Sequence, residues 1–176
     1  MNAPQAGAEH VLSVDIAVPR EKVWAEITKT GAIQRPLYNC VLETDFEPGS
    51  KLRYYSPDRK RVFVVGEIIE FSPPERFVHT YVFTQVSDEP PTVVTWELSE
   101  IATGCRVTVT HGGWTDAHKA PEKSAGGWGD ILGLLKDELE RGQISIKWRV
   151  IYRLGTAFMF MMPKSTTVAE VERAGW

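Results

Sequence analysis

Two histidines and two large aromatic residues occur at alternating positions of strand-like segments in the second half of the chain. His79 and Tyr81 lie two residues apart, so they share one face of their strand. Trp96 and His111 lie on the corresponding faces of the next two strand-like segments. An imidazole or a phenol on a pocket wall can act as a general acid or base. Aromatic walls with a few polar tips are also typical of small-ligand pockets.

A helix expected over residues 123–142, "KSAGGWGDILGLLKDELERG", would form the opposite wall of this space. Its apolar residues recur at offsets of three and four, the pattern of an amphipathic helix; they are Trp128, Ile131, Leu132, Leu135 and Leu139. The predicted ligand-binding residues are therefore His79, Tyr81, Trp96, His111, Trp128 and Leu132.

The same helix contains two glycines, Gly129 and Gly133, beside its apolar stripe. Each costs about 1 kcal/mol relative to alanine in an exposed helix interior. Residues four apart lie on one side of a helix. We expect the missing side chains either to let the helix approach the sheet closely or to leave room for a bound guest.

The spacing of the polar residues indicates neither a catalytic set nor a metal site. The four histidines, at positions 10, 79, 111 and 118, lack metal-ligand spacing, and no Ser/His/Asp or Cys/His arrangement can be assigned. Glu67 and Glu70 lie on opposite faces of a strand and cannot act as a carboxylate pair. No catalytic residue, metal or cofactor is predicted.

The order of the expected elements indicates an α+β fold. Alternating apolar residues and turn signals predict seven strands, over 11–18, 39–46, 50–56, 61–71, 76–83, 92–101 and 105–114. A short helix follows Pro19, and residues 30–38 are expected to form a loop or a second short helix. Strands first and a long helix last favour a curved antiparallel sheet around that helix.

Four segments resemble one known family, and together they extend over about residues 10–142. They are "VDIAVPREKVWAEIT", "GEIIEFSPPERFVHTYVF", "VTWELSE…GCRVTVTH" and "GGWGDILGLLKDELERG". The chain resembles the activator-of-heat-shock-protein-90-ATPase homologue-like (AHSA-like) branch of the START/SRPBCC superfamily. The resemblance implies a helix-grip (START/Bet v-like) fold, in which a seven-stranded antiparallel sheet wraps around the C-terminal helix, usually with an apolar cavity between them.

The function that these observations favour is binding of a small apolar or aromatic molecule in this cavity. Two alternatives stay open. One is a cyclase- or hydrolase-type enzyme that uses the same cavity, and the other is a co-chaperone-like module for protein interaction. Founding members of the family carry an additional N-terminal chaperone-binding domain, whereas this chain has only ten residues before its first expected strand, 11–18.

Composition narrows the class of protein. A net charge of −3 argues against a general nucleic-acid binder. The N-terminus has no apolar signal segment, and the longest apolar run, 154–162, is too short to span a bilayer. Cys40 and Cys105 are expected to be small buried residues in a reducing compartment. We expect a cytoplasmic protein with a disordered segment 1–10, one domain over 11–142 and an extension over 143–176.

The C-terminal extension is apolar and basic. Residues 144–154 fit a strand, but an apolar helical stripe continues to Met162, which favours a helix. Thr167 and Glu170 resemble a capping box, and Gly175 a helix end. The apolar residues need a surface to cover them: the protein's own sheet, a second subunit in a homodimer, or a membrane interface. The membrane is the least expected of the three.

Overall fold

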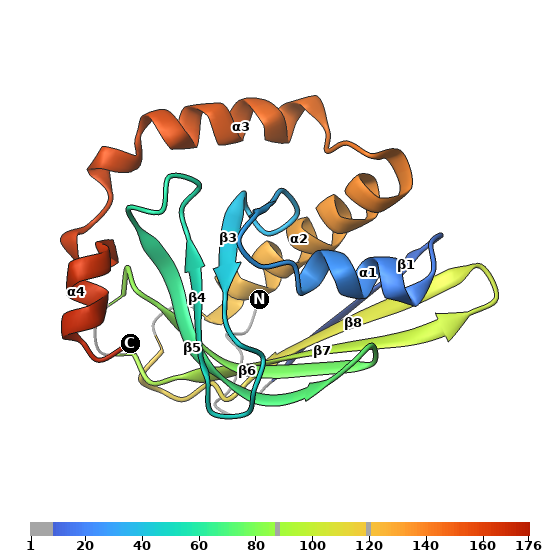
Figure 1. Cartoon of the computed structure of the whole chain (residues 1–176), viewed down its shortest axis with the longest axis horizontal. Helices are drawn as coiled ribbons and strands as arrows, with labels where there is room; N and C mark the ends of the chain where they lie inside the picture. The colour runs from blue at the N-terminus through green and yellow to red at the C-terminus, as the bar shows by residue number, and fades with distance from the viewer. Residues whose placement is uncertain (1–8, 87–88, 119–120) are drawn as a thin grey trace.

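The computed structural model describes residues 9–86, 89–118 and 121–176. Within these residues, eight strands form one antiparallel sheet that curls around a long helix (Figure 1). The strands are β1 His10–Ile16, β2 Ile33–Gln34, β3 Cys40–Glu43, β4 Lys51–Tyr55, β5 Val62–Ser72, β6 Arg76–Phe83, β7 Thr92–Ile101 and β8 Gly104–Gly112. The helices are α1 Arg20–Ile27, α2 Pro121–Arg141, α3 Ile146–Ala157 and α4 Val168–Arg173, with 3-10 turns at η1 Met159–Met161 and η2 Lys164–Thr166.

The strands lie in the order β1-β8-β7-β6-β5-β4-β3-β2. The last strand therefore pairs with the first, and residues 10–16 of β1 run antiparallel to 105–111 of β8. The β7–β8 turn needs a glycine at Gly104, where φ is +142° and an added Cβ would lie 2.2 Å from the carbonyl oxygen of Ile16. This tight turn sets the register of the two strands that carry Trp96 and His111.

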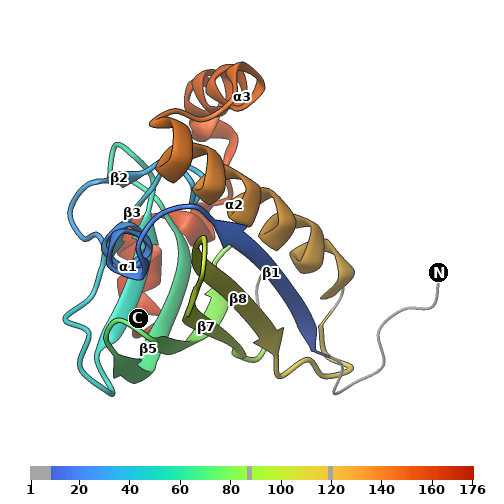
Figure 2. The same ribbon diagram turned by 90° about the vertical axis from the view of Figure 1, so that its right-hand side faces the viewer.

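The helix α2 lies across the concave face of the sheet, beside β1 (Figure 2). Its buried side chains include Trp128, Ile131, Leu132 and Leu135, as the sequence pattern predicted. Polar contacts fix its C-terminal half, since the Lys136 ammonium donates to the carbonyl of Asp15 at 2.6 Å. The sheet face that contains Phe77, Trp96 and Val109 packs against this helix.

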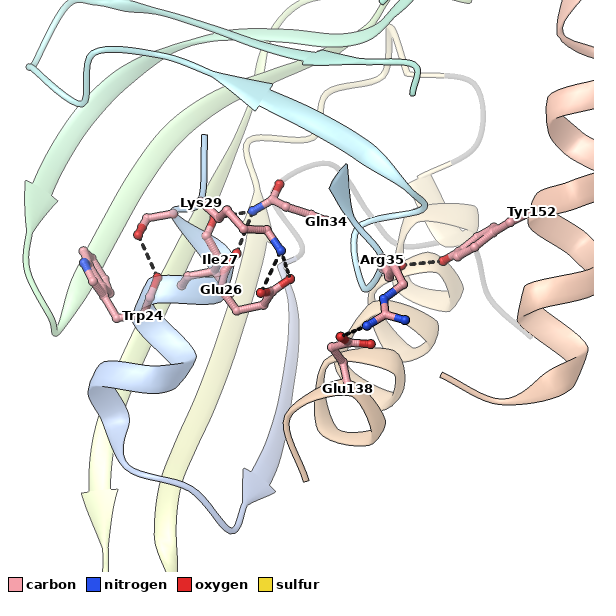
Figure 3. A network of polar contacts seen from close by, with 9 residues as sticks. Trp24, Glu26, Ile27, Lys29, Gln34, Arg35, Glu138 and Tyr152 are labelled. Atoms are coloured by element: carbon pink, nitrogen blue, oxygen red, sulfur yellow. Dashed lines mark hydrogen bonds and ion pairs between the residues drawn. The ribbon is translucent and has the colours of Figure 1, made fainter. Parts of the chain in front are cut away.

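The expectation of seven strands is wrong by one, because the segment 30–38 contributes β2. Gln34, fully buried, donates from its amide nitrogen to the carbonyl oxygens of Glu26 at 2.7 Å and Ile27 at 3.1 Å (Figure 3). These carbonyls belong to the last turn of α1, which lacks intrahelical partners for them. The glutamine thus holds the segment extended beside β3, where Ile33 pairs with Val41 and Gln34 with Cys40.

The C-terminal extension is helical rather than a strand. Its last helix, α4, packs on the outer face of the sheet, where Val171 contacts a cluster that includes Val41, Val62 and Val65. The Thr167 hydroxyl accepts from the Glu170 backbone N–H at 3.4 Å, which caps α4. In contrast, α3 runs along the outside of the molecule and contains no buried residue (Figures 1 and 2).

None of the helices in the described ranges combines the length and the hydropathy needed to cross a bilayer.

Candidate ligand-binding pocket

A cavity of about 620 Å³ lies between α2 and the sheet. Its walls are mainly apolar and aromatic. They come from the loop before β3, from β3–β6 and β8, from the segments that follow β6 and β8, from α2 and from the residue after η1. The lining residues are Leu37, Tyr38, Cys40, Tyr54, Phe63, Val64, Tyr81, Phe83, Gln85, Val86, Glu89, His111, Trp114, His118, Gly127, Trp128, Ile131 and Met162.

Three of the six predicted binding residues line this cavity: Tyr81, His111 and Trp128. Their rings contact one another, with centroid distances of 5.3 Å from Tyr81 to His111 and 5.9 Å from Tyr81 to Trp128. The strand alternation and the helix pattern therefore bring residues from β6, β8 and α2 to one wall.

The other three predicted residues, His79, Trp96 and Leu132, are buried but do not line the cavity. Trp96 packs edge-to-face against Trp128 at 5.5 Å, and both belong to the core between the sheet and α2. His79 precedes Tyr81 by two residues on β6. Its ring contacts the ring of Phe77, with centroids 4.8 Å apart. Part of the space between α2 and the sheet is thus filled by protein, and the cavity occupies another part.

His79 is an unusual core residue. Its Nδ1 is 2.8 Å from the carbonyl oxygen of Thr80, whereas its Nε2 is buried without a hydrogen-bond partner among the described residues. Burial lowers its pKa to about 4, although the Thr80 carbonyl opposes this shift. The imidazole is therefore neutral near pH 7, and its Nδ1 carries the proton that the carbonyl accepts.

His111 is held on both sides of its ring. The indole N–H of Trp128 donates to Nδ1 at 2.8 Å, and Nε2 lies 2.8 Å from the Thr92 hydroxyl. An indole nitrogen only donates, so Nδ1 must be the acceptor and Nε2 must carry the proton. Thr92 then accepts from Nε2–H and donates its own proton to the carbonyl of Tyr81 at 2.9 Å. Burial lowers the pKa of His111 to about 3, and nearby histidines add to this shift.

Two tyrosines of the cavity wall have hydroxyls without a hydrogen-bond partner among the described residues. In the part of the chain that the structure describes, neither the Tyr54 hydroxyl nor the Tyr81 hydroxyl forms a hydrogen bond with another protein group, and neither is sealed from open space. The Tyr38 hydroxyl differs, because it donates to the carbonyl of Gly127 at 3.1 Å. Tyr54 and Tyr81 are therefore the hydroxyls available to a molecule in the cavity.

Four ionisable groups on the cavity wall are held in their uncharged forms. Burial raises the pKa of the Cys40 thiol to about 12. Burial, followed by the charge of Asp130, raises the pKa of Tyr38 to about 12. Burial also raises the pKa of Tyr54 and of Tyr81 well above their usual range. Together with neutral His111, these groups make one uncharged part of the wall near pH 7, and the acidic residue Glu89 also lines the cavity.

The glycines singled out in the sequence do not line this cavity, and the packing of α2 on the sheet does not require them. Gly129 and Gly133 are both exposed. A Cβ at Gly133 would meet nothing within 4 Å, and one at Gly129 would make ordinary contact with Leu12 at 3.9 Å. The glycine that lines the cavity is Gly127, whose added Cβ would lie 3.5 Å from the Tyr38 hydroxyl.

Much of the wall was not predicted from the sequence. Tyr54 alternates with buried Leu52 on β4, so the same face-counting that identified Tyr81 could have found it. Residues such as Gln85, His118 and Met162 lie outside the strands and α2, and no periodicity marks them.

The comparisons with known proteins agree with this architecture. A solved protein from Mesorhizobium loti is 18% identical, with a TM-score of 0.65, and the match covers 78% of this chain and all of that one (100%). The Aha1 dimer from Colwellia psychrerythraea is 16% identical, with a TM-score of 0.63, over 78% of this chain and 99% of that one. An HSP90 activator from Plasmodium falciparum is 20% identical, with a TM-score of 0.56, over 69% of this chain and 88% of that one.

At these identities the solved structures show a shared fold. No curated protein matches the sequence significantly. The model of the family described as "Activator of Hsp90 ATPase homolog 1-like protein" matches residues 17–140, which is well over half of the chain and includes most of the cavity wall. The chain therefore belongs to the Activator of Hsp90 ATPase homolog 1-like family.

Proposed function

We propose that this protein binds an uncharged, mainly apolar small molecule in the cavity under α2. The observation that carries the proposal is a volume of about 620 Å³ whose walls are mostly apolar side chains. Small-ligand pockets are commonly 300–1,000 Å³ with a few placed polar groups. An apolar guest of matching size would make many packing contacts with these walls.

The neutral thiol, phenol and imidazole groups of the wall support a guest without a formal charge. The thiol, phenol and imidazole groups of Cys40, Tyr81 and His111 stay neutral near pH 7 for the reasons given above. Burying an ion among neutral groups is costly. The free hydroxyls of Tyr54 and Tyr81 fit a guest with one or two hydrogen-bonding atoms on an otherwise apolar frame.

An enzyme that uses His79 or His111 for acid–base catalysis would place that histidine on the cavity wall, within reach of a second titratable group. Both ring nitrogens of His111 are hydrogen-bonded to Trp128 and Thr92, neither of which titrates as a side chain near pH 7. His79 does not line the cavity. These contacts favour binding over acid–base catalysis by either histidine.

A chaperone-directed role is the second candidate, and the family description favours it. It calls for an exposed interaction surface and makes no use of an internal cavity. The two roles can be separated by asking whether substitutions inside the cavity alter what the protein binds.

The experiment uses N-phenyl-1-naphthylamine, a neutral apolar probe that becomes fluorescent in apolar surroundings. We expect saturable binding by the wild-type protein. Gly127→Leu should weaken it at least tenfold, because the new side chain grows from a position that lines the cavity. Gly133→Leu is the matched control on the same helix, since its side chain enters open space. Absence of saturable binding, or equal weakening by both variants, would contradict the proposal.

Native mass spectrometry of the purified protein provides an independent test, because it reports a co-purifying molecule directly. A guest that is retained by wild type and by Gly133→Leu, and lost from Gly127→Leu, supports binding in this cavity.

A further inference from the structure

The C-terminal arm, residues 144–162 with α3 and η1, exposes a continuous apolar stripe. Ile146, Val150, Leu154 and Phe158 are spaced by four, so they line one side of the helix. They are 75%, 50%, 55% and 57% exposed. Phe160 and Met161 extend the stripe and are 75% and 70% exposed. Single exposed apolar residues are ordinary, but a row of six marks an interaction site.

The side of α3 that faces the protein is occupied by other residues. The Tyr152 hydroxyl donates to the carbonyl of Arg35 at 2.7 Å (Figure 3). Trp148 packs on Tyr38 with ring centroids 5.6 Å apart. Arg35 in turn pairs with Glu138 of α2. These contacts fix the orientation of α3. The apolar stripe therefore lies on the side of the helix that points away from the rest of the protein.

The charged side chains of the arm are all positive. Residues 144–162 contain no Asp or Glu but include Lys147, Arg149 and Arg153, and Lys164 follows them. Within the described residues these four side chains form no ion pair with an acidic group. Arg149 and Arg153 flank the stripe, four residues apart on one side of it. An apolar stripe flanked by unpaired cations is the pattern of a helix that lies in the interface of an anionic bilayer.

We propose that the arm docks on an anionic lipid surface. The sequence alone favoured packing on the protein itself or on a second copy, but α3 has no buried residue, so the protein itself does not cover the stripe. A two-fold dimer through the stripe would bring Arg149 and Arg153 of both copies together on an arm without acidic partners. A bilayer with acidic headgroups complements both the stripe and the cations.

The arm is continuous with the pocket. Met162 follows η1 and lines the cavity. Tyr38 also lines the cavity, and its ring packs against that of Trp148 in α3. Docking through the stripe would therefore place the cavity close to the lipid surface. The proposal does not depend on the cavity having a guest, because it stands on the stripe and the charges of the arm.

The test is co-sedimentation of the full chain with vesicles of phosphatidylcholine alone and of phosphatidylcholine with 30% phosphatidylserine. We expect binding to the anionic vesicles to be at least tenfold tighter and to weaken with added salt. Arg149→Gln and Arg153→Gln should each lower the affinity about fivefold. Leu154→Glu with Phe158→Glu should abolish binding.

Val11→Glu is the control, because Val11 is also an exposed apolar residue (60%) but lies on β1. It should bind vesicles as wild type does, and circular dichroism should show that all variants are folded. The proposal is overturned if wild type does not prefer anionic vesicles or if Leu154→Glu with Phe158→Glu binds as wild type. It is also overturned if those two substitutions convert a dimer to a monomer, by analytical ultracentrifugation, in a protein that does not bind vesicles.

Discussion

Trp128 and His111 are joined by a hydrogen bond in which the indole N–H donates to Nδ1 at 2.8 Å. Because an indole cannot accept, this contact selects one tautomer of His111, with the proton on Nε2. We expect long-range proton–nitrogen NMR spectra at neutral pH to show this tautomer. A spectrum with the proton on Nδ1 would contradict the arrangement of the wall.

Trp128→Phe should remove this donor and leave a buried acceptor unpaired. An unsatisfied buried polar group costs about 1–3 kcal/mol, and the smaller ring leaves additional space. We expect the free energy of unfolding to fall by about 2–4 kcal/mol, measured by urea denaturation. Trp148→Phe is the matched control, because Trp148 lies on α3, which buries no residue. A similar loss in both variants would argue against a special role for the Trp128 contact.

Acidification should destabilise the fold through its two buried histidines. The pKa of His79 is lowered to about 4 and that of His111 to about 3, whereas an unfolded histidine titrates near 6.5. The fold thus prefers the neutral rings, and this stabilisation is complete above about pH 6.5 and is lost as the pH falls toward the folded pKa values.

The expected loss is about 2 kcal/mol for each histidine between about pH 7 and about pH 5. Urea denaturation at both values measures it. His79→Leu replaces an imidazole that has an unpaired nitrogen, and it should reduce the pH dependence by about 2 kcal/mol. A variant whose stability falls as steeply as that of wild type would show that His79 is not the source.

Most of the sheet was predictable because its signal is local. The strands β6 and β7 begin and end as expected, and buried and more exposed residues alternate along most of β7. The strand β2 was missed because it is only two residues long. What holds it is the Gln34 side chain on the end of α1, a tertiary contact that no periodicity reveals.

The site was predictable only in part, for a related reason. Alternation correctly placed His79, Tyr81 and Trp96 on the inner side of the sheet, but it cannot say which inner residues are covered by protein. That depends on where aromatic residues from separate segments meet, as when Phe46 stacks on Phe71 with centroids 4.4 Å apart. The glycines show the same limit. The helical pattern placed Gly133 beside the apolar stripe, but in the structure it lies on the outer side of α2.

Tyr81→Phe should distinguish guests by their hydrogen bonding. Its hydroxyl reaches the cavity without a protein partner, so removing it should leave the fold intact. We expect the affinity for 1-naphthol to fall about 2–10-fold, which corresponds to one neutral hydrogen bond. The affinity for naphthalene, which has no hydroxyl, should be unchanged. Calorimetric titration of both compounds measures the difference, and an equal loss for both would mean that the tyrosine acts only through its shape.

Gly133→Ala should stabilise the protein, because nothing around this position of α2 requires a glycine. Gly133 is exposed, and an added Cβ would meet nothing within 4 Å, so alanine gains helix propensity without a clash. The expected gain is about 0.5–1 kcal/mol in the free energy of unfolding. Gly104→Ala is the contrasting variant, because φ there is +142° and the new Cβ would lie 2.2 Å from a backbone oxygen. It should destabilise the protein by more than the gain at Gly133. If Gly133→Ala instead loses stability by thermal and urea denaturation, the outer side of α2 has a packing role that its open surroundings do not indicate.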